Sequence, residues 1–405
     1  MSAIVLNASA PVVARKDRGA LLRAYGLLAP LVVFLILTFV GPIGTLLWRA
    51  VADSELPQAM PATARAVADW DGISVPDERL FKPLIQDLKV VAPRDLAAAA
   101  RRLAYEAPAL RSLLMEAKRD ADNLEGSTSD MQKLDPRWLE NATWQTFKRA
   151  SGPVGTYHLL SAVDMKHDYQ QGLVAKDEAG LYRAILGRTF GIAAVTTLVC
   201  VLLAFPLCVF LDRRTPKTRN VLLLMILLPF WTSILVRTTA WMVLLQDEGV
   251  VNAALLKLGL INSPLHLLYN RFGVILALVH VMLPFMVFPL LAAMSSCNRL
   301  LVQAAYSMGA RPFRVFFQVY LPQVLPGLAA GALMVFIVTL GFYITPALLG
   351  GPADQMISFY IAQFTTGTLN WGLASALGLV LLIVTTLLYL IQAHLARRGT
   401  TGANR

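Results

Sequence analysis

Two adjacent carboxylates, Asp247 and Glu248, directly follow a long apolar run and could attract a cationic solute. Earlier in the same run, Arg237 is the only charged residue well inside a predicted membrane span. At 1.5 Å of helix rise per residue it would lie about 25 Å along that span, in the outer half of a membrane. A charge there is costly against lipid, so we expect Arg237 to face a water-lined path or a neighbouring helix.

Aromatic residues near these charges could make cation–π contacts with ammonium groups. The candidates are Phe230, Trp231, Trp241, Phe342 and Tyr343. Ordinary structural roles stay open as alternatives: a solvated loop end for the carboxylates, an outward-reaching interfacial arginine, and aromatics packed between helices. His280, inside another apolar run, is interpreted as a hydrogen-bonded core residue.

Motifs for catalysis, metal binding or nucleotide binding are absent from the sequence. It contains no HExxH, no CxxC and no GxxxxGK[ST], and Cys200, Cys208 and Cys297 have no metal-ligand spacing. We therefore expect a non-enzymatic chain without a cofactor and without an ATP-binding loop of its own.

The segment Leu301–Gly327 has the pattern of a surface that touches another protein. Small side chains at Ala304, Ala305 and Ala310 would keep it shallow, and Gly309 predicts a sharp turn with positive φ between two helical stretches. The candidate contact residues are Gln303, Ala304, Ala305, Gly309, Ala310, Phe313 and Pro322. The alternative is an ordinary helix–turn–helix between two membrane spans.

Composition predicts an integral membrane protein that is all-α. Of its 405 residues 56% are hydrophobic and only 15% are charged, whereas soluble proteins carry roughly 25% charged residues. A span needs ~20 mostly apolar residues, and the first is interpreted as an uncleaved anchor. About six predicted transmembrane helices cover residues 27–47, 189–211, 220–245, 272–294, 324–346 and 373–395.

The distribution of Lys and Arg predicts the orientation of these spans. Basic residues flank the apolar runs in the N-terminal tail 1–26, in the loop 295–323 and in the C-terminal tail 396–405. Both termini and the loop 295–323 are therefore expected in the cytoplasm. The net charge of +11 is explained by this flanking pattern, and it forms no single face that would indicate nucleic-acid binding.

Residues 51–180 form a large insertion between the first two spans, periplasmic on this topology. They carry a balance of −4 while the remainder of the chain carries +15. We expect a largely helical domain, with Asp135-Pro136 starting a helix, Trp138, Trp144 and Phe147 as core, and a loop at 125–129. It could be a helical elaboration without a ligand, or a docking site for a soluble partner.

Several motifs extend the pattern beyond the contact segment. They are Pro229-Phe-Trp-Thr-Ser-Ile-Leu-Val-Arg-Thr-Thr-Ala-Trp241, Leu283-Pro-Phe-Met-Val-Phe-Pro289 and Leu340-Gly-Phe-Tyr-Ile-Thr-Pro346. With Gln303-Ala-Ala, Gly309 and Leu321-Pro322, they resemble binding-protein-dependent ABC importer permeases, specifically the spermidine/putrescine branch. Gln303 stands where that family has Glu, which puts an ion pair with the ATPase at this position in doubt. The resemblance does not cover 51–180.

The resemblance implies a permease subunit in the bacterial inner membrane that passes a small solute, such as spermidine or putrescine. Its implied partners are a second permease subunit, a dimer of ATPase subunits that contacts the loop 295–323, a periplasmic solute-binding protein and membrane lipid. A permease for another small solute is the main alternative. An ion-coupled secondary transporter would favour carboxylates inside the spans, and a membrane-anchored sensor would use 51–180 to bind a ligand.

Overall fold

The computed structural model describes residues 18–169, 171–176 and 180–402. Parts of the two expected tails, residues 1–17 and 403–405, lie outside these ranges. The chain divides into two compact units, residues 1–48 and residues 49–405.

The first unit is an apolar helix of sufficient length to cross a membrane, as predicted for 27–47. It consists of α1 (Arg18–Leu35), a π-helical turn (Ile36–Val40) and α2 (Gly41–Arg49). Pro42 follows the π-helical turn, and proline cannot donate the hydrogen bond that a regular helix needs. The local change of helix type agrees with that loss.

The insertion opens the second unit and is built mainly from short helices, as predicted. They are α3 (Glu55–Ala59), α4 (Pro61–Asp69), α5 (Glu78–Val90), α6 (Pro93–Ala104), α7 (Ala109–Asp120), η2 (Ala121–Asn123), α8 (Thr128–Leu134), η3 (Pro136–Leu139), α9 (Asn141–Arg149) and α10 (Tyr157–Ala162). The expectation of an all-α protein missed one antiparallel hairpin, β1 (Met165–Asp168) and β2 (Gly172–Ala175).

An aromatic cluster forms the core of the insertion. Trp138, Trp144 and Phe147 are fully buried, and Trp144 Nε1 donates to the Trp138 carbonyl at 2.7 Å. Asp135 caps the following turn as predicted, because its carboxylate accepts from Arg137 N at 2.9 Å. The predicted loop at 125–129 is shorter than expected, since Ser127 already caps α8.

The remaining helices range from single turns to long apolar helices. They are α11 (Leu181–Asp212), α12 (Pro216–Leu227), η4 (Leu228–Trp231), α13 (Ile234–Leu245), α14 (Val250–Lys257), α15 (Arg271–Ser295), α16 (Arg299–Ser307), α17 (Pro312–Val315), η5 (Phe316–Tyr320), α18 (Leu321–Gly341), α19 (Ile344–Leu349), η6 (Pro352–Asp354), α20 (Ile357–Thr366) and α21 (Trp371–Gly402). Among the described residues of the whole chain, five helices could span a membrane, or six if one bent pair counts as a span.

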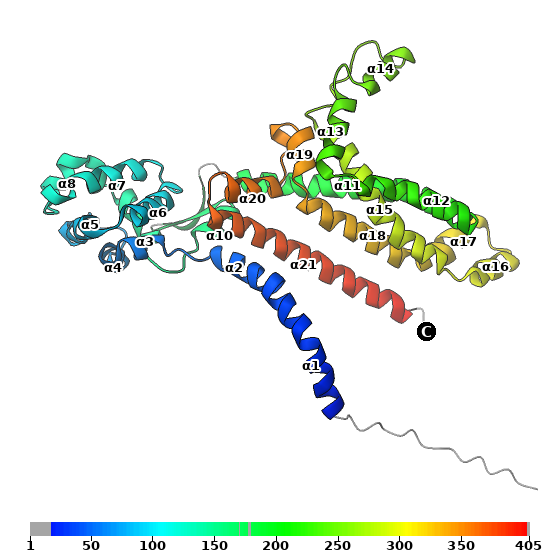
Figure 1. The fold of residues 1–405 in the computed structure, drawn as a ribbon, viewed down its shortest axis with the longest axis horizontal. Coiled ribbons are helices and arrows are strands. Elements are labelled where there is room, and N and C mark those ends of the chain that lie inside the picture. Colours follow the sequence, from blue (N-terminus) through cyan, green and yellow to red (C-terminus); the bar gives the residue numbers. More distant parts are fainter. Residues whose placement is uncertain (1–17, 170, 177–179, 403–405) are drawn as a thin grey trace, which may run out of the picture. The chain divides into compact units, whose positions relative to one another are not determined.

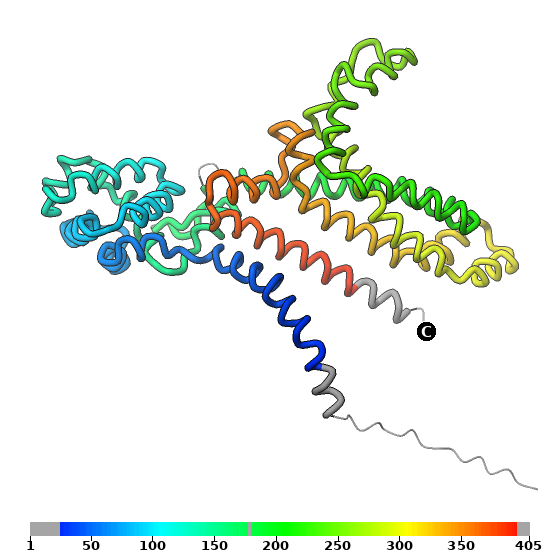
Figure 2. Tube along the Cα trace, in the orientation of Figure 1, coloured from blue at the N-terminus to red at the C-terminus, as the bar shows by residue number. Residues whose placement is uncertain are grey.

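The bent pair corrects the prediction of one straight span at 220–245. The helices on either side of Thr232 and Ser233 meet at 96°, and both residues have extended backbone angles. Pro229 contributes to the break because it cannot donate within the turn that precedes it. The height of 25 Å estimated for Arg237 assumed a straight helix, so that estimate does not hold. Figure 2 follows the chain through this bend into α14.

The fifth predicted span, 324–346, is shifted toward the N-terminus. The helix runs from Pro312 to Gly341, and Phe342 then takes an extended conformation. Glycine is a poor helix former, so Gly341 at the end of α18 favours a break here. Phe342 and Tyr343 therefore lie in a junction between α18 and α19, and residues 312–323 are helical and continue into α18.

Three helices, α11, α15 and α18, pack against one another as the core of the bundle (Figure 1). Gly327 and Gly331 lie where α18 meets α15, and a Cβ added at Gly327 would come within 2.7 Å of the Pro289 carbonyl oxygen. Small residues spaced in this way let membrane helices approach closely. The bundle thus depends on glycines that the hydrophobic pattern did not single out.

Candidate functional site

The turn predicted in the contact segment is present. Asn298 caps α16 by accepting from Leu300 N at 3.0 Å, and Gly309 adopts a φ of 78°. Gly309 N also donates to the Tyr306 carbonyl at 2.9 Å. This left-handed conformation is one that glycine adopts without strain, which is the physical reason for a glycine at this position.

The small residues of the segment do not all lie at its surface. Gln303 and Ala304 are exposed, and Ala310 is half-buried. Ala305 is only 6% exposed, so it packs against its own chain. The expectation that Ala305 contributes to a shallow outer surface is therefore wrong, whereas Ala304 fits it.

Several large apolar side chains of the same segment are exposed. Phe313 is 76% exposed and its ring lies 4.5 Å from that of Phe317. Leu300 and Met308 are also exposed, at 72% and 81%. Sequence reasoning selected Phe313 and missed the other two, because an apolar residue in a helical run is equally compatible with burial. Pro322 is exposed at the start of α18.

Polar contacts fix this segment to the bundle. Arg299 Nη2 donates to Asp212 at the end of α11 at 2.9 Å. Asn298 N donates to Gln323 Oε1 at 2.9 Å, and Gln323 Nε2 donates to the Val319 carbonyl at 2.8 Å. Asp212 and Gln323 were not predicted, since nothing in a single sequence pairs residues so far apart.

Arg237 lies at the bend between η4 and α13. Its guanidinium donates to the Thr232 carbonyl at 2.9 Å and also to the Pro229 carbonyl, and it lies 5.8 Å from the centre of the Phe230 ring. Backbone carbonyls freed by a helix break must find donors when water is scarce. Arg237 therefore stabilises the bend by donating hydrogen bonds to these backbone carbonyls.

Trp241 and Phe342 belong to the packed interior of the bundle. Trp241 Nε1 donates to His280 Nδ1 at 3.1 Å, which confirms the interpretation of His280 as a hydrogen-bonded core residue. Trp241 and Phe342 both pack against the buried residues around Val274 and Leu278. Their aromatic rings are therefore largely in contact with other side chains of the protein.

The remaining path candidates are exposed. Asp247 Oδ2 and His266 Nδ1 are hydrogen-bonded at a distance of 2.9 Å. Glu248, the next residue in the chain, is exposed. Trp231 is 79% exposed and Tyr343 42%. The structure thus separates the predicted path residues into a bend around Arg237, a packed pair and an exposed acidic end, and it does not gather them into one pocket.

Comparison with known proteins defines the class. Residues 179–400 match the family of binding-protein-dependent transport system inner membrane components, which covers the bundle and the contact segment. The chain belongs to this family. It is accordingly a multi-pass inner-membrane component of a transport system and not an enzyme.

Particular relatives narrow the comparison. The chain is 32% identical over 211 residues to the spermidine/putrescine transport system permease protein PotB of Haemophilus influenzae, covering 52% of this chain and 74% of that protein. It is 34% identical over 236 residues to the inner membrane ABC transporter permease protein YdcU of Escherichia coli, covering 54% and 72%.

A solved bacterial ABC transporter involved in the import of the acidic polysaccharide alginate is also similar. It matches with a TM-score of 0.44 and 22% identity over 54% of this chain and 79% of that one.

Proposed function

We propose that this chain is the permease subunit of an ATP-driven importer that passes a polyamine, such as spermidine or putrescine, from a periplasmic binding protein across the inner membrane. Its family membership supports the transport role, and its similarity to PotB supports the solute. The functional complex would hold a second, different permease subunit and a dimer of ATPase subunits.

The observation that carries this proposal is the stretch of residues 298–320, which lies between α15 and α18 and contains most of the candidate contact residues. It presents Phe313, Met308 and Leu300 to the outside, yet polar contacts hold it firmly on the bundle. Large apolar side chains that stay exposed on a segment attached to the helical bundle are typical of a protein–protein interface. We assign it to the ATPase, on the cytoplasmic side that the Lys and Arg distribution predicts.

In this account the solute path involves the exposed acidic end and the bend. Asp247 and Glu248 would attract the cationic solute by long-range electrostatics, which are screened over ~8 Å at physiological salt. Trp231 and Tyr343, which are exposed in the isolated chain, could offer aromatic faces to its ammonium groups. Arg237 would set the shape of the path by holding the bend.

A matched pair of phenylalanines tests the assignment of the contact segment. Phe313 and Phe272 are both exposed, at 76% and 58%, but Phe272 lies at the start of α15, on the opposite side in the proposed topology. Phe313→Ala should reduce co-purification of the ATPase subunit by about tenfold or more, since a central aromatic anchor contributes ≥ 2 kcal/mol. Phe272→Ala should retain it. Equal retention by both variants would refute the assignment.

A further inference from the structure

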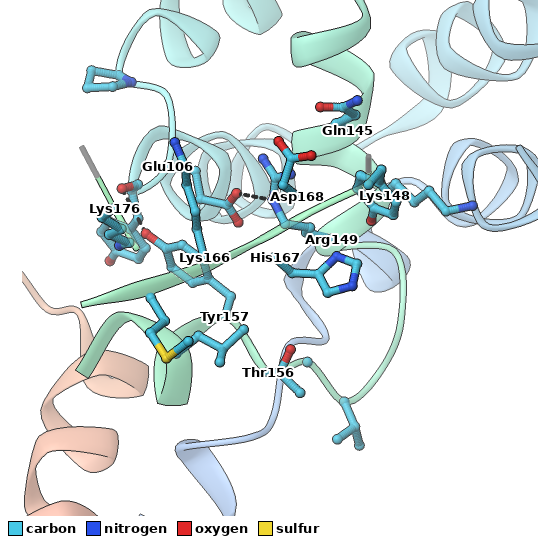
Figure 3. Close-up of a pocket in the computed structure, with 17 residues that line it drawn as sticks. Glu106, Gln145, Lys148, Arg149, Thr156, Tyr157, Lys166, His167, Asp168 and Lys176 are labelled. Atoms are coloured by element: carbon cyan, nitrogen blue, oxygen red, sulfur yellow. Dashed lines mark hydrogen bonds and ion pairs between the residues drawn. The ribbon is translucent and has the colours of Figure 1, made fainter. Parts of the chain in front are cut away.

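The insertion contains an open cavity that the transport role does not use. Its volume is about 880 Å³, and its walls come from the end of α6, from α9, from the start of α10 and from β1. Figure 3 shows Glu106, Arg149, Tyr157 and His167 around this space. Residues of this region lie outside the part of the chain matched by the family.

A chain of charges runs from the cavity wall, at Glu106 and Arg149, into the buried interior. Arg102 is 2% exposed and donates through Nε to Asp53 at 2.7 Å and through Nη1 to Glu106 at 3.1 Å. Arg149 Nε donates to the other oxygen of Glu106 at 2.6 Å. Two carboxylates and two guanidinium groups thus alternate, and the chain Asp53–Arg102–Glu106–Arg149 is neutral as a whole.

Two ammonium groups lie beside this neutral chain without a carboxylate partner among the described residues. Lys176 Nζ donates to Ser161 Oγ at 2.8 Å and lies 5.2 Å from the centre of the Tyr157 ring. Lys148 Nζ donates to the carbonyls of Ala68 and Trp70, which do not line the cavity, and lies 5.9 Å from the centre of the Tyr169 ring. Burial lowers the pKa of Lys176, although Glu106 and Asp164 oppose that effect. The lining holds four basic residues, Lys148, Arg149, Lys166 and Lys176, against the two carboxylates of Glu106 and Asp168, so its formal charge is positive.

The contacts of these cations decide which ligand the cavity suits. A cationic ligand would need carboxylates and aromatic faces, but Glu106 is held by two arginines. The Tyr157 ring already faces Arg102 at 4.4 Å as well as Lys176. An anion would instead meet the Lys176 ammonium group and the Arg149 guanidinium, and such groups bind carboxylate or phosphate oxygens by charge-assisted hydrogen bonds.

We infer that this cavity is a binding site for a small anion that carries carboxylate or phosphate groups, held by Lys176 and Arg149. The site is separate from the proposed polyamine path, and its charge would repel a polyamine. A ligand here would attach α9, α10 and the hairpin to one another, and so would stabilise the insertion.

Binding is tested on the purified full chain with citrate and with inorganic phosphate as probes. Thermal unfolding and calorimetric titration are compared with sodium chloride at matched ionic strength, which separates binding from screening. We expect saturable binding of at least one probe above the chloride control. Lys176→Gln should weaken it about tenfold, because the substitution removes a charged hydrogen-bond donor to the anion. Glutamine keeps a donor for Ser161.

The matched control is Lys89→Gln, which removes the same charge from an exposed position of the insertion away from the cavity. It should bind the probe as the wild type does. Absence of saturable binding to the wild type would overturn the inference, as would equal weakening by Lys89→Gln and Lys176→Gln. These outcomes do not bear on ATPase co-purification, so failure here is distinguishable from failure of the proposed function.

Discussion

Gly309 and Gly259 adopt the same left-handed backbone, with φ of 78° and 68°, and a Cβ at either would meet open space. Alanine at either position costs about 1 kcal/mol of backbone strain. If the turn at Gly309 shapes the ATPase contact, Gly309→Ala should lower ATP-dependent uptake severalfold and Gly259→Ala should leave it near wild type. Uptake measured in parallel at matched membrane levels checks this, and equal effects would contradict the role of the turn.

His158 offers a second test at the residue scale. It is 5% exposed and its ring packs directly on the backbone of Gly372 in α21. Burial, with help from the charges of Arg102 and Lys176, lowers the pKa of His158 to about 3. A depressed pKa favours the neutral form in the fold, so its contribution is fully present above the unfolded value near 6.5 and is lost as pH falls toward 3.

We therefore expect the free energy of unfolding of the wild type to fall by about 2 kcal/mol more than that of His158→Gln between pH 6.5 and 4.5. Glutamine is neutral throughout this range and acts as the reference. Denaturant unfolding of the two proteins at several pH values provides the measurement. If the free energies of unfolding of the two proteins change with pH in parallel, protonation of His158 does not limit the stability of the contact between α10 and α21.

Residue-level prediction succeeded where the reason is local. The turn at Gly309 and the cap at Asp135 follow from backbone preferences within a few residues. Prediction failed where a partner is distant in sequence: Arg299 pairs with Asp212 and Gln323 with Asn298. The burial of Ala305 was also missed, because a small residue suits both a surface and a close contact.

At the scale of elements, the glycines between α18 and α15 give a direct prediction. A methyl group at Gly327 would overlap Ala293 and Pro289, and overpacking costs ~1–3 kcal/mol. Gly327→Ala should lower the thermal unfolding midpoint in detergent. Gly187→Ala, in α11 with open space around the added group, should keep or raise it, since alanine favours helix. A midpoint unchanged by Gly327→Ala would argue against close packing here.

Apolar runs predicted the positions of most spans because burial in lipid requires continuous apolar residues. They could not predict the 96° bend, since the two helices that it joins are together long and apolar enough to pass as one span. The structure shows that the bend is stabilised by hydrogen bonds from Arg237 to backbone carbonyls at the break. The helices α14 and α20 were also missed, because short helices outside spans lack a long periodic pattern.

At the scale of the whole molecule, the proposed topology places the insertion in the periplasm and the contact segment in the cytoplasm. A cysteine at exposed Ser129 should react with an impermeant maleimide in intact spheroplasts, and one at exposed Thr215 only after permeabilisation. The background should carry Cys297→Ser, because Cys200 and Cys208 are buried but Cys297 is not. The reverse labelling pattern would overturn the topology.

The central claim is that this chain conducts a polyamine only when an ATPase drives it. The direct test is uptake of labelled spermidine into proteoliposomes that contain this chain, its partner permease and its ATPase, with the binding protein outside and ATP inside. We predict uptake that requires both ATP and the binding protein and that falls with Phe313→Ala but not with Phe272→Ala. Uptake driven by an ion gradient without ATP, or no spermidine uptake by an assembly that hydrolyses ATP, would contradict the account.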